Sequence, residues 1–391
     1  MSQTIESRLQ TLIGRGVVVV DPRQTYVAPE VDPERVFPGS VLFPGARLCG
    51  ARTLVGSRAQ IGTEGPAVLR DAVVGAGAEV ASGFLAESTL LPGAKAGANA
   101  HFRAGTLLEE EASTAHAVGL KQSILMYSVT LGSLINLCDA LVSGGRSRAE
   151  HTEIGSGFIH FNFTPWGKRG DKATPTLIGN VTEGVFLDQE RIFLGGMSGI
   201  VGPDSVGFGA MTVAGQVIRK PVPGGTMHAE FGREFDRSFV PTEAAFSDKH
   251  LARVRARNLE FIAQLYALKA WYSEIRLKRS LLQKDAELSL VLSGALETIR
   301  CCLDERFRRY NSFAAEWAQP LFDPRALDTD AAGPAFAFDW KLDAAYDKWV
   351  AGLGEGEKRA LHDWLAGHAA RLKQALQKQN SEAEAGRNVR V

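Results

Sequence analysis

The sequence has 391 residues, enough for two domains, because a single hydrophobic core rarely grows beyond about 250–300 residues. Lys plus Arg and Asp plus Glu number 44 each, so the formal net charge is zero. A neutral chain lacks the positive field that would hold nucleic acid or an anionic membrane surface. The four cysteines match no zinc site, and no apolar run approaches the ~20 residues of a membrane span. We therefore expect a cytoplasmic protein without metal, nucleic acid or membrane span.

A repeat of six residues dominates the first two-thirds of the chain. Each hexad is typical of one flat face of a solenoid, and three faces close a coil of about eighteen residues, so that residues eighteen apart stack. A β-sandwich would instead alternate with period two. The sequence therefore predicts a linker helix over 1–16 and a left-handed parallel β-helix over 17–240. The apolar residues that carry the repeat are expected to point inward, and most of them are followed by Gly, Pro or Ala. They include Val31, Phe37, Phe43, Cys49, Val55, Ile61, Val74, Leu131, Ile154, Ile178 and Val201.

Segments outside this repeat are of two kinds. Residues 143–153 and 164–176 are polar and punctuated by Gly or Pro, which predicts loops that leave the β-helix, where binding sites are often built. From about residue 241 the apolar spacing becomes helical over 247–283, 285–318 and about 339–379. We expect an α-helical appendage over 247–380, with a surface for a protein partner, and a disordered tail over 381–391. The charged stretches of the helical appendage indicate solvated helix faces, and contact with nucleic acid is the less favoured alternative.

Five segments carry a resemblance to a known family: 16–26, 102–106, 120–123, 154–157 and 159–163. They resemble the C-terminal domain of the bacterial bifunctional enzymes that make UDP-N-acetylglucosamine, over roughly residues 5–225. The resemblance implies a trimer that transfers an acetyl group from acetyl-CoA to glucosamine 1-phosphate, with the active site between subunits. The family's uridylyltransferase domain has no counterpart in this sequence, and the family does not supply the helical appendage.

The resemblance assigns the family's phosphate-binding arginine to Arg103 and its sugar-binding lysine to Lys121. Because these positions are eighteen apart, stacking places a guanidinium and an ammonium one coil apart, which suits a phosphate. Asp139, eighteen residues further, would complete the stack. Without the family match, exposed charges on a solenoid face are the simpler interpretation.

The other positions carried over from the family divide between acceptor and acyl donor. Phe163 replaces a family tyrosine, and the longer loop leaves the choice between Lys168 and Lys172 open. The resemblance places Asn136, Asn162 and Lys168 or Lys172 on the substrate side, and Ser156, Phe163 and Ser198 on the acyl-CoA side.

The general base of the family is missing from its position. Ser133 stands where the resemblance places the catalytic histidine, and Asn136 where it places a tyrosine. A base with a pKa near 7 contributes typically 10²–10⁴-fold, and a serine alone cannot supply this. We hypothesise that His151, eighteen residues beyond Ser133, or His160 is the base. His116 lies one coil earlier, and for each histidine a partly exposed side chain without catalytic role is the alternative.

Three functions follow from these observations. The first is CoA-dependent acyl transfer to a sugar phosphate or nucleotide sugar by a homotrimer. The second is a non-catalytic protein that binds a nucleotide sugar or serves as a trimeric scaffold, which the lost histidine favours. The third is an accessory chain of a nucleotidyltransferase, which the linker helix favours.

Overall fold

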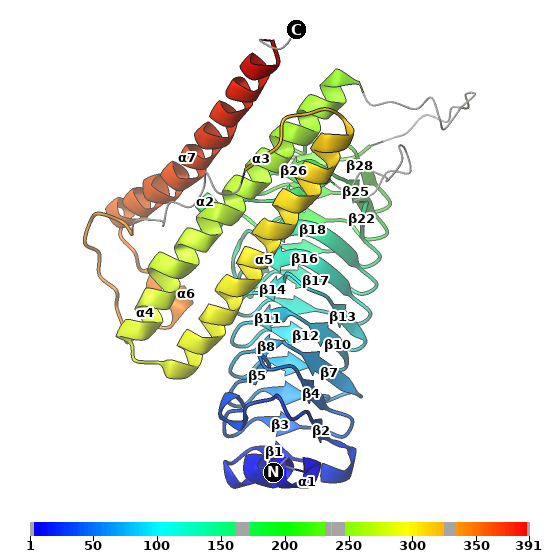
Figure 1. The fold of residues 1–391 in the computed structure, drawn as a ribbon, viewed down its shortest axis with the longest axis vertical. Helices are drawn as coiled ribbons and strands as arrows, with labels where there is room; N and C mark the ends of the chain where they lie inside the picture. The colour runs from blue at the N-terminus through cyan, green and yellow to red at the C-terminus, as the bar shows by residue number, and fades with distance from the viewer. Residues whose placement is uncertain (1–3, 162–172, 231–235, 237–246, 324–332, 389–391) are drawn as a thin grey trace.

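The computed structural model describes residues 4–161, 173–230, 236, 247–323 and 333–388. A helix, α1 (Ile5–Gly14), covers one end of a parallel β-solenoid that runs from β1 (Val18–Val19) to β29 (Met227–His228). The remaining helices follow the last strand or interrupt the solenoid: α2 (Val181–Gly184), α3 (Asp248–Ala270), α4 (Leu277–Leu282), α5 (Ala286–Glu316), α6 (Tyr346–Ala351) and α7 (Glu355–Asn388). Figure 1 shows α3 and α5 running along one side of the solenoid. The predicted left-handed parallel β-helix followed by a helical region is confirmed.

The solenoid has three faces, each built from parallel strands in successive coils. The first face is the 11-stranded sheet β1, β3 (Val41–Leu42), β6 (Gln60–Ile61), β9 (Glu79–Val80), β12 (Lys95–Ala96), β15 (Ser113–Thr114), β17 (Thr130–Leu131), β21 (Glu153–Ile154), β24 (Phe193–Leu194), β27 (Met211–Thr212) and β29.

The second and third faces form one continuous 16-stranded sheet, because β16 (Gly119–Leu125) and β18 (Asn136–Val142) bend from one face to the other. The second face holds β2 (Tyr26–Val27), β4 (Arg47–Cys49), β7 (Ala67–Arg70), β10 (Gly83–Ala86), β13 (Ala100–Phe102), the first halves of β16 and β18, β22 (Ile159–Phe161), β25 (Gly199–Val201) and β28 (Val217–Ile218). The third holds β5 (Leu54–Val55), β8 (Val73–Val74), β11 (Ser88–Leu90), β14 (Thr106–Leu108), the second halves of β16 and β18, β23 (Thr176–Ile178) and β26 (Asp204–Val206).

The phase of the repeat differs from the prediction in the first coils. Val36, Leu42 and Leu48 are fully buried inside the solenoid. The residues that follow them, Phe37, Phe43 and Cys49, were expected to point inward but are only partly buried. An additional residue in the coil shifts the phase, since Leu42 pairs with Ile61 across 19 residues rather than eighteen. From Val55 to Ile178 the predicted inward positions are buried, but at Val201 the phase is again wrong by one residue, because Ile200 is the buried residue there.

Coil length varies along the solenoid. Lys95 pairs with Ser113 across 18 residues, but Glu79 pairs with Lys95 across 16 and Gln60 with Glu79 across 19. The corner turns absorb these differences, while each strand keeps its inward residue buried. Sequence spacing alone therefore locates a stacked partner only to within a residue or two.

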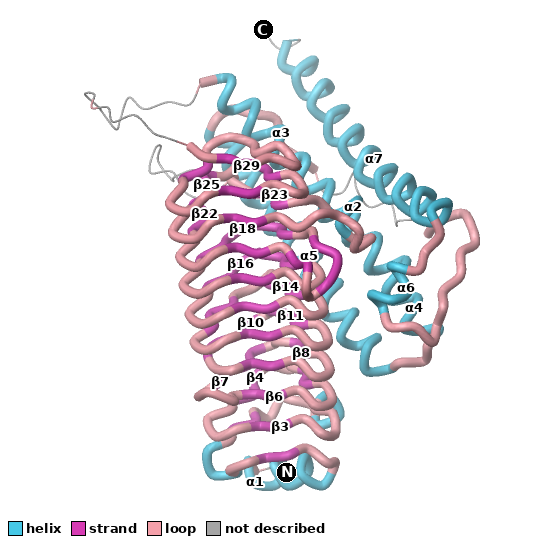
Figure 2. The backbone as a smooth tube through the Cα atoms, turned by 180° about the vertical axis from the view of Figure 1, so that it is seen from behind, coloured by secondary structure: helices cyan, strands magenta, loops and turns pink. Residues whose placement is uncertain are grey.

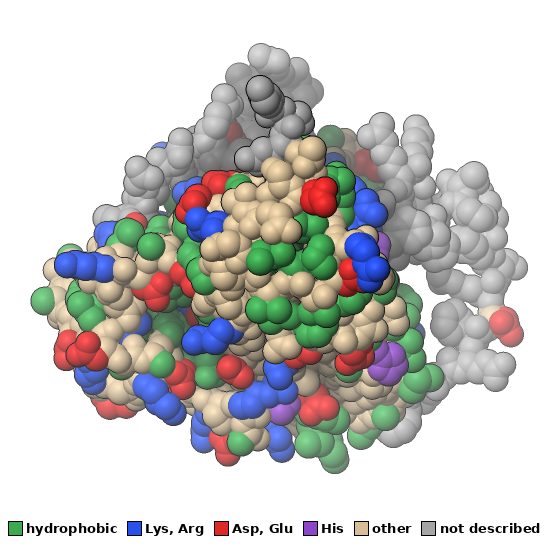
Figure 3. Space-filling model, turned by 90° about the horizontal axis from the view of Figure 1, so that it is seen from below, with side chains coloured by type: hydrophobic (Ala, Val, Ile, Leu, Met, Phe, Trp, Pro, Cys, Tyr) green, Lys and Arg blue, Asp and Glu red, His purple; other side chains and the backbone are tan. Residues whose placement is uncertain are grey.

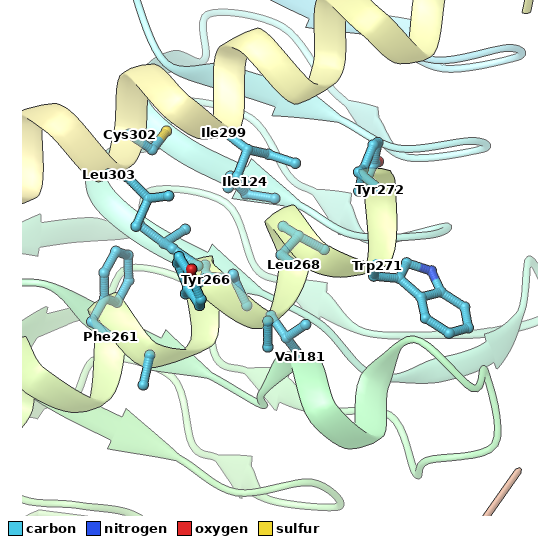
Figure 4. Close-up of a cluster of buried hydrophobic side chains, with 14 of the residues drawn as sticks. Ile124, Val181, Phe261, Tyr266, Leu268, Trp271, Tyr272, Ile299, Cys302 and Leu303 are labelled. Carbon is cyan, nitrogen blue, oxygen red and sulfur yellow. The ribbon is translucent and has the colours of Figure 1, made fainter. Parts of the chain in front are cut away.

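The third face is covered by helices, as Figure 2 shows from the opposite side. Its outward side chains are aliphatic: Leu54, Val73, Leu107, Ile124 and Leu141 belong to the same buried cluster as the apolar residues of α3 and α5. Figure 4 shows Ile124 of β16 beside Ile299 and Leu303 of α5 and Leu268 of α3. The helical region is thus a layer on the β-helix rather than a separate body.

Glycine allows α5 to approach the sheet closely. A Cβ atom on Gly294 would lie 2.8 Å from Cγ2 of Val73. Nearby, the hydroxyl oxygens of Thr89 and Thr298 are 2.9 Å apart in a buried hydrogen bond. This stretch of α5 therefore packs with its backbone almost against the strands.

A buried ion network joins the same two layers at a π-helical segment, Trp271–Arg276, between α3 and α4. The Arg276 side chain is 2% exposed, donates a hydrogen bond to Glu110, and lies 3.5 Å from Oε1 of Glu109. The Tyr272 hydroxyl donates to Glu109 at 2.7 Å and accepts from Arg276 at 2.8 Å. Burial raises the pKa of Glu109, and Arg276 opposes part of that rise.

The last helices differ in detail from the sequence expectation. The predicted helix over about 339–379 is interrupted near Gly352, which separates α6 from α7. Helix α7 then continues to Asn388, into the stretch expected to be disordered. Ala and Glu, which favour helix, are frequent there. In the part of the chain that the structure describes, no helix is both long and apolar enough to cross a bilayer. Seen from below (Figure 3), Lys and Arg side chains alternate with Asp and Glu over the surface.

Candidate functional site

Arg103 and Lys121 lie on adjacent rungs of the second face. Phe102 pairs with Leu120, so the residues that follow each of them are neighbours across the sheet, about 4.8 Å apart in backbone position. Nη2 of Arg103 is 3.7 Å from Sγ of Cys138, which lies one rung beyond Lys121. Burial raises the pKa of the Cys138 thiol, and the charges of Arg103 and Lys121 oppose that rise. The structure thus brings the two predicted cations together.

Asp139 does not complete this stack, because the next coil is one residue shorter. Lys121 pairs with Cys138, across 17 residues. Asp139 turns the corner with φ of 58° and faces α5, where its carboxylate lies 3.6 Å from Nη1 of Arg306. The third member of the stack is therefore a thiol, and the helical layer neutralises the carboxylate.

The second face carries further polar and aromatic side chains beside the cations. Asn136 is exposed, and its Oδ1 lies 3.9 Å from the Cys138 Sγ. Towards the N-terminal coils, the rings of Phe84 and His101 are 5.6 Å apart with 32° between their planes. The guanidinium of Arg70 lies 5.4 Å from the centre of the Phe84 ring. These side chains form an aromatic platform next to Arg103.

Ser133 lies at the corner between the first and second faces. Its hydroxyl oxygen is 3.0 Å from Nδ1 of His116, one coil below. Its backbone N–H donates to Oγ of Ser156, one coil above, at 3.0 Å. The backbone N–H of Met197 donates to the Ser156 carbonyl at 2.7 Å, and the Met197 side chain is 80% exposed. The corner therefore presents one imidazole and two hydroxyls to solvent.

His151 does not stack over Ser133, which corrects the geometry expected from its spacing. It belongs to an inserted hairpin of β19 (Gly145–Ser147) and β20 (Glu150–His151), within the segment predicted to loop out. Its Nδ1 is 2.8 Å from the Arg148 carbonyl, and its Nε2 is 3.8 Å from a Glu153 carboxylate oxygen. The hairpin lengthens this coil, so Ser156 takes the position above Ser133.

The hairpin borders a hollow of about 770 Å³ on the first face. Arg146 and Arg191 line it together with Glu150 and Glu190, so both signs of charge are present. Phe193 and Met211 supply an apolar floor. This mixture selects for no single class of ligand.

His160 is buried between the second and third faces. It is 4% exposed, its Nδ1 contacts the Cys138 carbonyl, and its Nε2 is 3.0 Å from the Thr176 hydroxyl. Burial lowers the pKa of His160 to about 4, against the opposing influence of Asp139. Both ring nitrogens are engaged, so the side chain cannot meet a substrate proton without a rearrangement.

The remaining predicted residues are divided between the corner and the undescribed segment. Ser198 is buried, donates to the Gly196 carbonyl at 3.0 Å and accepts from the Gln216 backbone N–H at 3.0 Å, so its hydroxyl is occupied within the corner. Asn162, Phe163, Lys168 and Lys172 lie outside the described residues.

Two contributors to the site were not assigned roles from the sequence. The His116–Ser133 contact joins residues 17 apart, a spacing that a strict period of eighteen conceals. Arg306 comes from the helical layer, for which the family resemblance offers no template. Across the described ranges, no group of three or more His, Cys, Asp or Glu side chains is arranged to hold a metal.

Comparisons with known proteins add sequence relatives. No protein-family model matches the chain. The bifunctional protein GlmU of Thermus thermophilus is 36% identical over 220 residues, which is 55% of this chain and 42% of the relative. GlmU of Pseudarthrobacter chlorophenolicus is 32% identical over 216 residues, 54% of this chain and 38% of the relative. The chain thus spans less than half the length of these relatives.

Solved structures give only distant alignments. The polySia specific acetyltransferase NeuO aligns with 60% of this chain and 99% of its own, at 14% identity and a TM-score of 0.25. LpxA from Acinetobacter baumannii aligns with 74% of this chain and 95% of its own, at 17% identity and a TM-score of 0.21. The sequence relatives are the informative ones: as its motifs predicted, this chain is similar to the bifunctional GlmU proteins over about half of its length.

Proposed function

We propose that the protein transfers an acyl group from acyl-CoA to a sugar phosphate or nucleotide sugar. One observation carries the proposal: Arg103 and Lys121 lie on adjacent rungs, on the face that begins at the His116–Ser133 corner. A phosphate-binding pair and an exposed imidazole are the two elements that acyl transfer to a phosphorylated sugar requires. The similarity to GlmU proteins supports the same chemistry.

The cation pair suits a phosphate because its members differ in geometry. Arg103 offers a planar fork that can donate two parallel hydrogen bonds, and Lys121 offers a compact point charge. In a chain with a net charge of zero, such a local pair supplies the attraction that the whole protein lacks. The thiol of Cys138, on the rung after Lys121, carries no charge at neutral pH, because burial raises its pKa.

His116 is the best-placed base for this site. It is exposed, whereas His160 is buried with both nitrogens engaged, and His151 belongs to the hairpin. Lys121 follows His116 by five positions, which is at most about 16 Å of extended chain, and the long lysine side chain shortens that gap. A sugar phosphate bound by the cations can therefore present its amine or hydroxyl to the imidazole.

The platform of Arg70, Phe84 and His101 favours a nucleotide sugar over a simple sugar phosphate. It lies on the same face as Arg103, with Phe84 two rungs from Lys121. Stacking of a base on an aromatic side chain contributes about 1–3 kcal/mol. A nucleotide sugar can place its phosphates on the cations while its base rests on the platform.

The assembly that fits this proposal is a cytoplasmic homotrimer, as the GlmU resemblance implies. The helical layer covers the third face, so neighbouring subunits have the first and second faces for contact. On the first face, Phe193, Met211 and Met227 occupy successive rungs and are 36–76% exposed. Acyl-CoA, bound at Ser156 and Met197 beside the corner, would then lie near a subunit boundary.

The test combines ligand binding with turnover. We expect acetyl-CoA and UDP-N-acetylglucosamine each to raise the melting temperature, because a ligand that binds only the folded state stabilises it. Release of CoA thiol should require an amino sugar phosphate or nucleotide sugar as acceptor. The double variant Arg103→Ala/Lys121→Ala should lose the response to the acceptor and keep the response to acetyl-CoA. Lys95→Ala, an exposed cation on the first face, is the matched control.

A protein that shows no stabilisation by any acyl-CoA tested, and no thiol release, would not be an acyltransferase. The second candidate function, a binding protein for nucleotide sugars, would then remain. One observation favours it: Ser133 replaces the residue that the resemblance makes the base. Its signature is stabilisation by UDP-N-acetylglucosamine without any response to acetyl-CoA.

A further inference from the structure

We propose that Ser133 is a nucleophile that receives the acyl group from acyl-CoA, so that transfer passes through a serine ester on the enzyme. This inference rests on the proposed acyltransferase function and specifies its chemical course. Ser133, which stands where the family has its catalytic histidine, would then act in catalysis together with His116. The acceptor then meets an acyl-enzyme rather than acyl-CoA itself.

The geometry of the corner supplies a nucleophile and its base. The Ser133 hydroxyl oxygen is 3.0 Å from Nδ1 of His116, within hydrogen-bond reach. The coils hold the pair in register, because the backbone N–H of Leu134 donates to the His116 carbonyl at 3.1 Å. His116 is exposed and Ser133 is partly exposed, so a thioester can approach. With Nδ1 accepting, the imidazole is in the tautomer that can take the hydroxyl proton.

A third group is placed to stabilise the developing oxyanion. Oγ of Ser156 accepts a hydrogen bond from the Ser133 backbone N–H at 3.0 Å, which leaves the hydroxyl hydrogen of Ser156 for another acceptor. That hydroxyl is exposed beside the nucleophile. A donor aimed at the carbonyl oxygen of a tetrahedral intermediate is the usual way to lower the barrier to acyl transfer.

The surroundings also suit the acyl donor. Met197 is 80% exposed, and its backbone N–H is bonded to the Ser156 carbonyl. A thioether side chain is flexible and packs against irregular apolar groups. Met197 can therefore rest against the pantetheine arm or the acyl chain while the thioester carbonyl lies between Ser133 and Ser156.

The reaction balances in two acyl transfers without any oxidant or metal. In the first, the Ser133 proton passes to His116, the Oγ–C bond forms, and the C–S bond breaks. The CoA thiolate leaves and takes the proton from His116. In the second, an amine or hydroxyl of the acceptor attacks the ester carbonyl, gives its proton to His116, and the Ser133 oxygen leaves with that proton.

Acylation of the full-length protein in the absence of acceptor tests this directly. Rapid acid quench after mixing with acetyl-CoA should show a mass increase of one acetyl group, located on Ser133 by peptide mapping. Ser133→Ala should lose the adduct, and both Ser133→Ala and His116→Ala should lower turnover by about 10²–10⁴-fold. Ser133→Cys keeps a nucleophile and should form a thioester that hydroxylamine removes.

The matched control is Ser113→Ala, which removes another hydroxyl bonded between coils, to Thr130 at 3.3 Å. It should keep both the adduct and the turnover, and melting temperatures verify folding of every variant. A Ser133→Ala protein that transfers acyl groups at the wild-type rate would overturn the serine ester while leaving the proposed function intact. A wild-type protein that binds no acyl-CoA would instead overturn the proposed function itself.

Discussion

The second and third faces of the solenoid are built from the same repeat but present opposite chemistry. On the second face, outward positions such as Arg103 and Asn136 are exposed. On the third, outward positions such as Leu107 and Ile124 are at most 1% exposed, because α3 and α5 cover them. Apart from His160 on the second face, the inward residues of both faces are apolar. The outward residues therefore decide whether a face stays open to solvent or is covered by helices.

This difference is visible in the sequence as a doubled apolar residue. Strands of the third face contain adjacent aliphatic pairs, such as Val73–Val74, Leu107–Leu108 and Leu141–Val142. A strand that is buried on both sides needs such a continuous apolar run, whereas a half-exposed strand alternates. On the second face, buried apolar residues alternate with exposed ones, as Phe102 and Arg103 show. This face therefore stays open to solvent.

The largest difference between the two faces should be seen when the same charged residue is placed on each of them. Ile124→Asp buries a carboxylate between the third face and α5, and we expect it to lower the free energy of unfolding by at least about 4 kcal/mol or to prevent folding. Ile159→Asp makes the same change on the second face, where Ile159 is 44% exposed. We expect it to cost less than about 1 kcal/mol. Urea denaturation measures both, and equal losses would show that α5 does not cover the third face.

The ion pairs that join the two layers should differ in the same way. Arg276→Ala leaves the buried Glu109 and the partly buried Glu110 without their cation, which we expect to cost about 3–5 kcal/mol. Arg52→Ala removes an ion pair that also joins the solenoid to the helical layer, with Glu297 of α5 at 3.1 Å. In this pair both side chains are more than a third exposed. We expect a loss below about 1 kcal/mol there. A small effect of Arg276→Ala would mean that the π-helical segment does not anchor the layer.

The boundary between the two faces can be tested through pH. Burial lowers the folded-state pKa of His160 to about 4, from an ordinary value of 6.5, so between pH 6.5 and 4 the unfolded state binds the proton and the folded state largely does not. Stability should then fall as pH drops from 6.5 to 4, by on the order of 3 kcal/mol from this residue. His160→Gln should flatten that part of the profile, and His151→Gln should not. Parallel profiles for the wild type and His160→Gln would contradict the buried neutral imidazole.

The sequence predicts the fold well because its strongest signals are periodic. The six-residue repeat and the helical spacing after residue 247 identify both layers. The doubled aliphatic pairs mark the strands that the helices cover, a signal that the periods alone do not include. The predicted phase was wrong at Phe37, Phe43 and Cys49, because one additional residue in a coil shifts the inward position without changing the period. It was also wrong by one residue at Val201, where Ile200 points inward.

The candidate site is predictable only where coil length stays constant. Arg103 and Lys121 meet because their coil has eighteen residues. Asp139 is displaced because the next coil has 17, and His151 because an inserted hairpin lengthens its coil. Each error follows from a small change at a corner, where the chain tolerates insertion. Stacking arguments for a solenoid therefore need the length of every coil between the two residues.

The smallest effect concerns the open face itself and tests whether Arg103 and Lys121 bind one phosphate. Each single alanine variant should weaken binding of glucosamine 1-phosphate by about 10–100-fold, which corresponds to about 1.4–2.8 kcal/mol, with almost no change in unfolding free energy. Arg47→Ala, an exposed arginine on the same face several rungs away, should bind as the wild type does.

The double variant then decides between one shared phosphate and two independent contacts. Side chains that bind the same ligand group are coupled, so the double loss should differ from the sum of the single losses by at least about 0.5 kcal/mol. Independent contacts would give additive losses, and the adjacent rungs would then hold two separate anions. Calorimetric titration at low and high salt separates these cases from general charge attraction, because screening weakens exposed long-range attraction far more than direct contacts. A coupling that persists at high salt would place both side chains on one phosphate.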